Sequence, residues 1–129
     1  MPTPTLENFP IISGQLITVQ KTYLFDAAHI LEDLPKHDCG QWHGHGYKLC
    51  VYAKAIPDET GLVIDISELD QIVRPILKKL DHSVLNNVML NPTLENVATY
   101  ILSYLCLQNP RIFKVRLYQN ENLYAEIHI

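Results

Sequence analysis

The order of the elements predicts an α+β fold in which two helices pack on one face of a four-stranded antiparallel sheet, in the order ββααββ. β-Branched and aromatic residues gather in two segments before residue 57 and in two segments after residue 110. Between residues 66 and 105, apolar residues recur at helical spacing instead. At 129 residues the chain has the length of one domain. We therefore expect an irregular N-terminal lead-in at residues 1–15 and a single domain at residues 16–129.

The first two strands are predicted at residues 16–28 and 45–56. The first segment is rich in β-branched and aromatic residues, and the second alternates apolar with polar residues. Between them, residues 32–44 are rich in Pro, Asp, Gly and His, which indicates a loop. The segment from Pro57 to Gly61 supplies the next turn.

The middle of the chain predicts two helices. The first has either Ser67 or Asp65 as its N-cap, and the second has Thr93. Their apolar stripes are Ile66, Leu69, Ile72, Val73, Ile76, Leu77 and Leu80, and then Val97, Tyr100, Ile101, Tyr104 and Leu105. Residues 111–119 and 123–129 complete the fold as a hairpin across Asn120–Asn122.

Composition narrows the class of protein. Hydrophobic residues make up 47% of the chain and charged residues 19%, which is typical of a globular protein. The net charge of −4 argues against nucleic acid as the main partner. There is no apolar run of the ~20 residues that a membrane helix needs. The three cysteines lack CxxC spacing, which favours reduced thiols and a cytoplasmic protein without a membrane partner.

The pair His43-Gly44-His45 opens the second predicted strand. Side chains at i and i+2 of a strand point to the same side, so both imidazoles can bind one ion. His29, at the end of the first strand, is the natural third ligand of an open zinc site. Taken alone, an HxH pair fits a metal site or two loop histidines with ordinary hydrogen bonds.

Further groups are open to more than one interpretation. Cys39, four residues before His43, fits a fourth zinc ligand, a catalytic thiol, an oxidation-prone thiol or a small apolar residue. Asp81 can orient His82 as a base, although a helix C-terminus also favours a histidine through its dipole. Glu95 fits an acid favoured in the first turn of a helix.

Several stretches together resemble the 6-pyruvoyl-tetrahydropterin synthase and 6-carboxy-tetrahydropterin synthase family. They are FDAAH (25–29), CGQWHGHGY (39–47), GLVIDISEL (61–69), LDHSVLN (80–86) and PTLEN (92–96), and they follow the family's order. The resemblance implies the tunnelling fold (T-fold) and a homo-oligomer, a trimer or hexamer with active sites at subunit interfaces.

The resemblance also implies the roles of individual residues. The zinc ligands would be His29, His43 and His45, the thiol base Cys39, and the proton relay Asp81 with His82. The substrate would be dihydroneopterin triphosphate, a pterin triphosphate, held by residues that include Thr93 and Glu95.

Two details bear on the reaction. Three residues separate Cys39 from His43, as in the bacterial 6-carboxy enzymes of the queuosine (deazaguanine) pathway, which also release acetaldehyde. Where the family has a pterin-anchoring Glu, this chain has Gln119, with Glu121 two residues further on. Three functions follow: 6-carboxy-tetrahydropterin synthase, 6-pyruvoyl-tetrahydropterin synthase, or a zinc-binding relative with altered ligand specificity.

Overall fold

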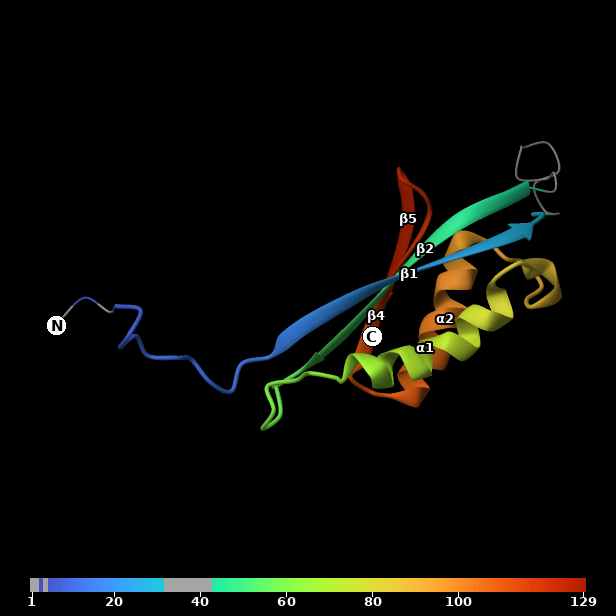
Figure 1. The fold of residues 1–129 in the computed structure, drawn as a ribbon. Helices are drawn as coiled ribbons and strands as arrows, with labels where there is room; N and C mark the ends of the chain where they lie inside the picture. Colours follow the sequence, from blue (N-terminus) through green and yellow to red (C-terminus); the bar gives the residue numbers. More distant parts are fainter. Residues whose placement is uncertain (1–2, 4, 32–42) are drawn as a thin grey trace.

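The computed structural model describes residue 3 and residues 5–31 and 43–129. Its centre is a mixed five-stranded sheet in the order β3-β1-β2-β4-β5, covered on one face by two helices (Figure 1). The longest strands are β1 (Ile17–His29) and β2 (His43–Ala55). They are antiparallel along their whole length, so that Ile17 pairs with Ala55 and His29 with His43. This register brings the predicted histidine positions to one end of the sheet.

The two predicted helices are present and pack on the sheet through their apolar stripes. Helix α1 (Ile66–Leu80) is capped by Asp65, whose side chain accepts a hydrogen bond from the Ser67 N–H at 2.7 Å, so Ser67 is not the cap. Helix α2 (Leu94–Gln108) is capped by Thr93, as predicted. The buried core that they form with the sheet includes Leu49, Val51, Leu69, Val73, Leu80, Val97, Ile101, Leu105, Val115 and Leu117.

The sheet differs from the four-stranded antiparallel prediction by one short strand. Strand β3 (Ser83–Val84) lies between the helices in the sequence and pairs in parallel with Ala27 and Ala28 of β1. A 3-10 helix, η2 (Leu85–Asn87), follows it. A strand of two residues is too short to show an alternating pattern, which is why the sequence gives no sign of it.

The closing hairpin consists of β4 (Ile112–Asn120) and β5 (Leu123–His128). Tyr118 pairs with Tyr124 and Asn120 with Leu123, so Gln119 is an extra residue in β4. Such a bulge alters the direction of a side chain and is common beside binding sites. Gln119 is therefore in a position where its side chain is not fixed by regular alternation.

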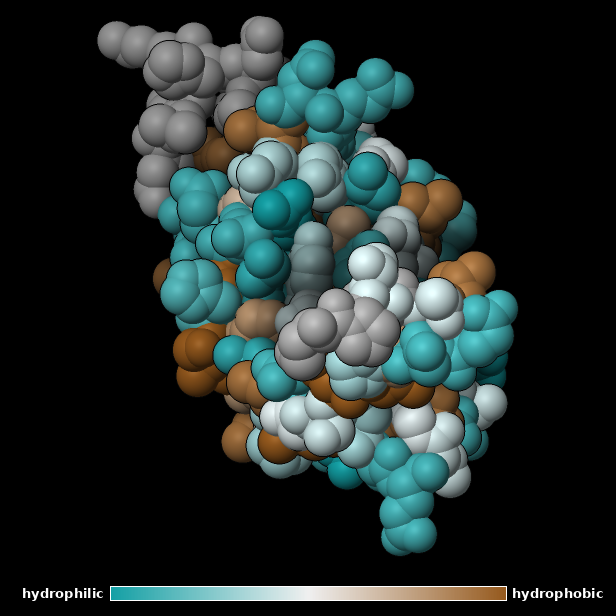
Figure 2. All heavy atoms as spheres, turned by 90° about the vertical axis from the view of Figure 1, so that its left-hand side faces the viewer, coloured by the Kyte–Doolittle hydropathy of each residue, from teal (hydrophilic) through white to brown (hydrophobic). Residues whose placement is uncertain are grey.

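The N-terminal segment leads away from the sheet (Figure 1). Its apolar side chains are exposed, including Leu6, Ile11 and Ile12. From that side of the molecule, apolar residues form separate patches among hydrophilic ones (Figure 2). Of the helices in the described part of the chain, none has the length and apolar character needed to cross a membrane.

Candidate active site

His29 is the last residue of β1 and is 1% exposed. Its Nδ1 lies 2.9 Å from the carbonyl oxygen of Pro92, in the segment that leads into α2. A carbonyl oxygen only accepts hydrogen bonds, so Nδ1 must carry the proton and donate it. In the neutral ring, the lone pair is therefore on Nε2. A backbone carbonyl behind Nδ1 is the usual support of a metal-binding imidazole.

His45 lies beside His29 on the neighbouring strand. The two ring centroids are 5.0 Å apart, with the ring planes at 88°. Residue 43 pairs directly with His29 in the sheet register, and the side chain of His43 is outside the described part of the chain. The structure thus brings two of the three predicted ligands together and places the backbone of the third beside them.

This group of residues fits a zinc ion. Imidazole nitrogens are ligands that zinc prefers, and three of them leave a fourth position for water or substrate. The hydrogen bond from His29 to Pro92 supports zinc binding by His29. It occupies Nδ1 with a proton, and a neutral ring then has its lone pair on Nε2, where a metal can bind. Cys39 lies outside the described residues, so its role as the thiol of this site stays a prediction.

Tyr47 follows His45 by two residues on β2 and is completely buried. Its ring stacks on that of Phe25, with centroids 4.9 Å apart, and lies edge-on to His45 at 5.7 Å. Burial raises the pKa of the phenol to about 12, so the hydroxyl keeps its proton at neutral pH. None of the described residues forms a hydrogen bond with this hydroxyl. Tyr47 was not predicted as a site residue, because an aromatic residue in a strand is ordinarily a core residue.

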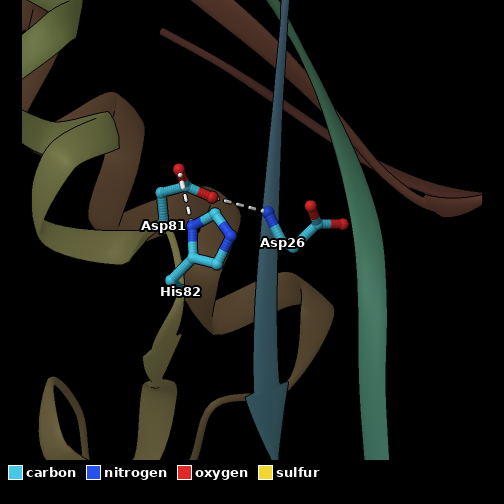
Figure 3. A group of neighbouring side chains, drawn as sticks. All are labelled: Asp26, Asp81 and His82. Carbon is cyan, nitrogen blue, oxygen red and sulfur yellow. Dashed lines mark hydrogen bonds and ion pairs between the residues drawn. The ribbon is translucent and has the colours of Figure 1, made fainter.

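The Asp81–His82 pair forms a tight turn at the end of α1. The Asp81 N–H donates to the carbonyl of Leu77 at 2.7 Å, which ends the helix. Asp81 Oδ2 lies 3.0 Å from His82 Nδ1, as the predicted relay requires (Figure 3). Asp81 Oδ1 also accepts a hydrogen bond from the Asp26 N–H at 2.9 Å. This backbone N–H, with a further contribution from His82, lowers the pKa of the Asp81 carboxyl.

A second backbone contact fixes His82 in a strained conformation. The His82 N–H donates to the Asp26 carbonyl at 2.6 Å, and the φ angle of His82 is 54°. Residues other than glycine rarely adopt this left-handed region. Such strained backbone persists only where neighbouring contacts stabilise it. Both backbone groups of Asp26 hold the turn, while the side chain of His82 is 80% exposed. The turn thus presents an oriented imidazole to the surface.

Asp26 is the residue near this turn that sequence analysis missed. Its carboxylate comes within 4.8 Å of the ligand atoms of Asp81 and His82. It is directed away from the His82 ring, toward β2 (Figure 3). A β-carbon at Gly46 would lie 3.3 Å from Asp26 Oδ1, so glycine at that position leaves room for the carboxylate. Residues 26 and 82 meet only through the pairing of β1 with β3, which no local pattern predicts.

Two hollows accompany these groups. One, of about 520 Å³, is lined by Asp26, Ala27, Ala28, Gly44, His45, Gly46, His82, Ser83 and Val84. The other, of about 580 Å³, is lined by Leu31, Thr93, Leu94, Glu95, Gln119, Leu123, Tyr124, Ala125 and Glu126. The second hollow thus brings together Thr93, Glu95 and Gln119, the three predicted substrate-binding residues. Glu121 lies in the hairpin turn and is not among the residues that line it.

The side chains of His29 and Asp26 lie on opposite faces of β1. Phe25, Ala27 and His29 are buried on the face that the helices cover, whereas Asp26 is exposed. Successive side chains of a strand alternate between faces, so Asp26 lies on the face opposite to His29. The Asp81–His82 turn contacts both backbone groups of Asp26 at the edge of β1, and His82 lines one hollow together with His45.

Comparison with known proteins gives consistent results. The family model described as 6-pyruvoyl tetrahydropterin synthase matches residues 18–128. A 6-carboxy-5,6,7,8-tetrahydropterin synthase of Synechocystis sp. is 36% identical over 97 residues, which are 67% of this chain and 73% of that protein. A protein of Archaeoglobus fulgidus that carries this name provisionally is 38% identical over 104 residues, 80% of this chain and 88% of its own. The structure of Caenorhabditis elegans 6-pyruvoyl tetrahydropterin synthase shares the fold, with a TM-score of 0.83 at 24% identity over 92% of this chain and 99% of that chain.

Proposed function

Because the chain belongs to the 6-pyruvoyl tetrahydropterin synthase family, we propose that it is a zinc-dependent lyase acting on dihydroneopterin triphosphate. Its products would be 6-carboxy-tetrahydropterin, acetaldehyde and triphosphate. The observation that carries the proposal is the pair His29 and His45, with His29 held by Pro92 in the tautomer that presents the Nε2 lone pair to a metal. The relatives named for this synthase, at 36% and 38% identity, support this choice of product.

The histidines would hold the metal, and the remaining residues would move protons. Bound zinc would supply Lewis acidity toward the side-chain hydroxyls of the substrate. Cys39 would take a proton from the substrate side chain as its thiolate. His82, oriented through Nδ1 by Asp81, would exchange a proton at Nε2. The lowered pKa of Asp81 keeps this carboxylate charged, so that it is a strong acceptor for the N–H at Nδ1 of His82.

The hollow at Thr93, Glu95 and Gln119 would bind the pterin ring. Glu95 lies in the first turn of α2, and its carboxylate can accept hydrogen bonds from the N–H groups of the pterin ring. The side-chain carbonyl of Gln119 can accept one more bond, without the charge that a Glu would add. This position in a bulge gives Gln119 room to turn its carbonyl oxygen, and not its amide NH2, toward the ligand.

We propose that the protein works as a homo-oligomer with sites between subunits. The support is that the side chain of His82 is largely exposed, so that it can serve another copy. Analytical ultracentrifugation would measure the mass of the assembly, and a monomer would contradict this part of the proposal.

The central experiment follows the products of zinc-loaded protein with dihydroneopterin triphosphate by mass spectrometry. Formation of 6-carboxy-tetrahydropterin with acetaldehyde, lost in Cys39→Ala, is the expected result. Accumulation of 6-pyruvoyl-tetrahydropterin without acetaldehyde would favour the second candidate, 6-pyruvoyl-tetrahydropterin synthase.

Gln119→Glu is the matched variant for ligand specificity. Under the proposal it retains turnover and binds the substrate more tightly, because a charged acceptor replaces a neutral one. An inactive native chain that becomes active in Gln119→Glu would show that the pocket has been altered for another ligand.

A further inference from the structure

The hydroxyl of Tyr47 is a buried polar group that the proposed mechanism leaves unused. The residue is completely buried, and none of the described residues forms a hydrogen bond with its hydroxyl. Buried polar groups in folded proteins almost always have a partner, and an exception calls for a specific explanation such as a catalytic role or a bound ion.

Packing alone does not account for this hydroxyl. Phe25 pairs directly with Tyr47 in the sheet register, and the two rings stack with an interplanar angle of 8°. Phe25 is equally buried and fills its place without a polar group. A phenylalanine at position 47 would give the same stacking and would bury no donor.

The surroundings of Tyr47 point to the histidine site. Among the described residues, the buried polar or charged ones are His29 and Asn109. Asn109 is already engaged, because its side chain accepts from the Arg111 N–H at 3.0 Å and donates to Glu68 at 3.4 Å. Tyr47 instead lies edge-on to His45, and His45 lies edge-on to His29. The three rings therefore form one continuous group on the helix-covered face of the sheet.

We propose that Tyr47 is a positioning residue of the histidine site, whose hydroxyl donates a hydrogen bond to the oxygen ligand that shares the zinc with the three histidines. The inference rests on the proposed zinc binding and adds a residue to it. A phenol O–H is a suitable donor here, because an anionic oxygen ligand such as hydroxide is a strong acceptor. Groups that hydrogen-bond to metal ligands commonly support metal affinity as much as orientation.

The test compares Tyr47→Phe with Tyr52→Phe as the matched control. Tyr52 is on the same strand but on the opposite face, with Lys114 Nζ 4.4 Å from the centre of its ring. Two quantities are measured for each: the urea midpoint of the metal-free protein, and the zinc dissociation constant by competition with a chromophoric chelator. For Tyr47→Phe we expect a midpoint at least equal to that of the native protein and zinc binding weakened about tenfold. Tyr52→Phe should bind zinc as the native protein does.

Each other outcome overturns the inference. Native zinc affinity in Tyr47→Phe would show that the hydroxyl does not support the site. Weaker zinc binding together with a lower urea midpoint would show that the hydroxyl already has a partner in the metal-free protein. If the native protein itself binds no zinc, the proposed metal site fails as well, and the native titration alone identifies that case.

Discussion

Mixing two inactive variants tests whether the histidine site of one copy uses the Asp81–His82 pair of another. Cys39→Ala removes the proposed thiol base, and His82→Ala removes the exposed imidazole of the turn. Each variant alone should be nearly inactive. Within one chain, His29 and Asp26 lie on opposite faces of β1. Asp26 is the residue of β1 that lies near His82. We therefore expect an intact site to draw its histidines and its Asp81–His82 pair from different copies.

The expected recovery follows from counting subunits. In a random one-to-one assembly, a site is intact when its first copy carries native Cys39 and its second copy carries native His82. Each condition holds for about half of the copies, so about a quarter of the sites are intact. Triphosphate release by the mixture should reach about a quarter of the native rate with an unchanged KM.

The matched control is native protein mixed with the double variant of Cys39→Ala and His82→Ala. Sites between copies give about a quarter of native activity in both mixtures, whereas sites within one chain give none in the first and about half in the second. The second pattern would refute the reasoning. It would mean that His82 serves the His45 of its own chain, through the hollow that both residues line.

Three further predictions concern the elements that build the site. In urea titrations, His82→Val should lower the free energy of unfolding by about 2 kcal/mol more than His82→Gly, because residue 82 has a positive φ. Equal decreases in the two variants would show that the backbone relaxes at this residue. The lowered pKa of Asp81 means that its carboxylate stabilises the fold above its ordinary pKa of 3.8 and that this contribution is lost as the pH falls further. Between pH 5 and about pH 3, the free energy of unfolding should therefore fall less in Asp81→Asn than in the native chain. An equal fall in both proteins, measured by urea titration at each pH, would contradict this. Thr93→Ala removes the N-cap of α2 and should cost about 1 kcal/mol, or a few degrees in Tm by calorimetry, whereas Thr93→Ser should retain most of it.

Local patterns predicted most of the fold because its main elements are long. The strand expected at residues 16–28 is observed as Ile17–His29, and the helix that begins after Thr93 has the predicted cap. Asp65 prevails over Ser67 as the cap of α1 because the Asp65 side chain reaches the N–H two residues on. Strand β3 was missed, since its pairing with β1 is a contact between distant segments.

The site shows the same division between local and distant information. His45 beside His29 follows from spacing on two adjacent strands, so the sequence was sufficient for it. The proximity of Asp26 to His82 and the bulge at Gln119 depend on how separate elements pair. Tyr47 has an ordinary strand pattern, and its unused hydroxyl becomes visible only when its surroundings are known.

The hydrogen bond from His29 to Pro92 joins the proposed metal site to the segment that leads into the second hollow. Pro92 immediately precedes Thr93, which lines the second hollow and caps α2. A ligand that steadies this segment also steadies the imidazole that the segment holds. By linkage, a pterin that tightens metal binding by some factor must itself be bound more tightly, by the same factor, when the metal is present. We therefore expect the occupancy of either proposed site to change the affinity of the other through the backbone of residue 92.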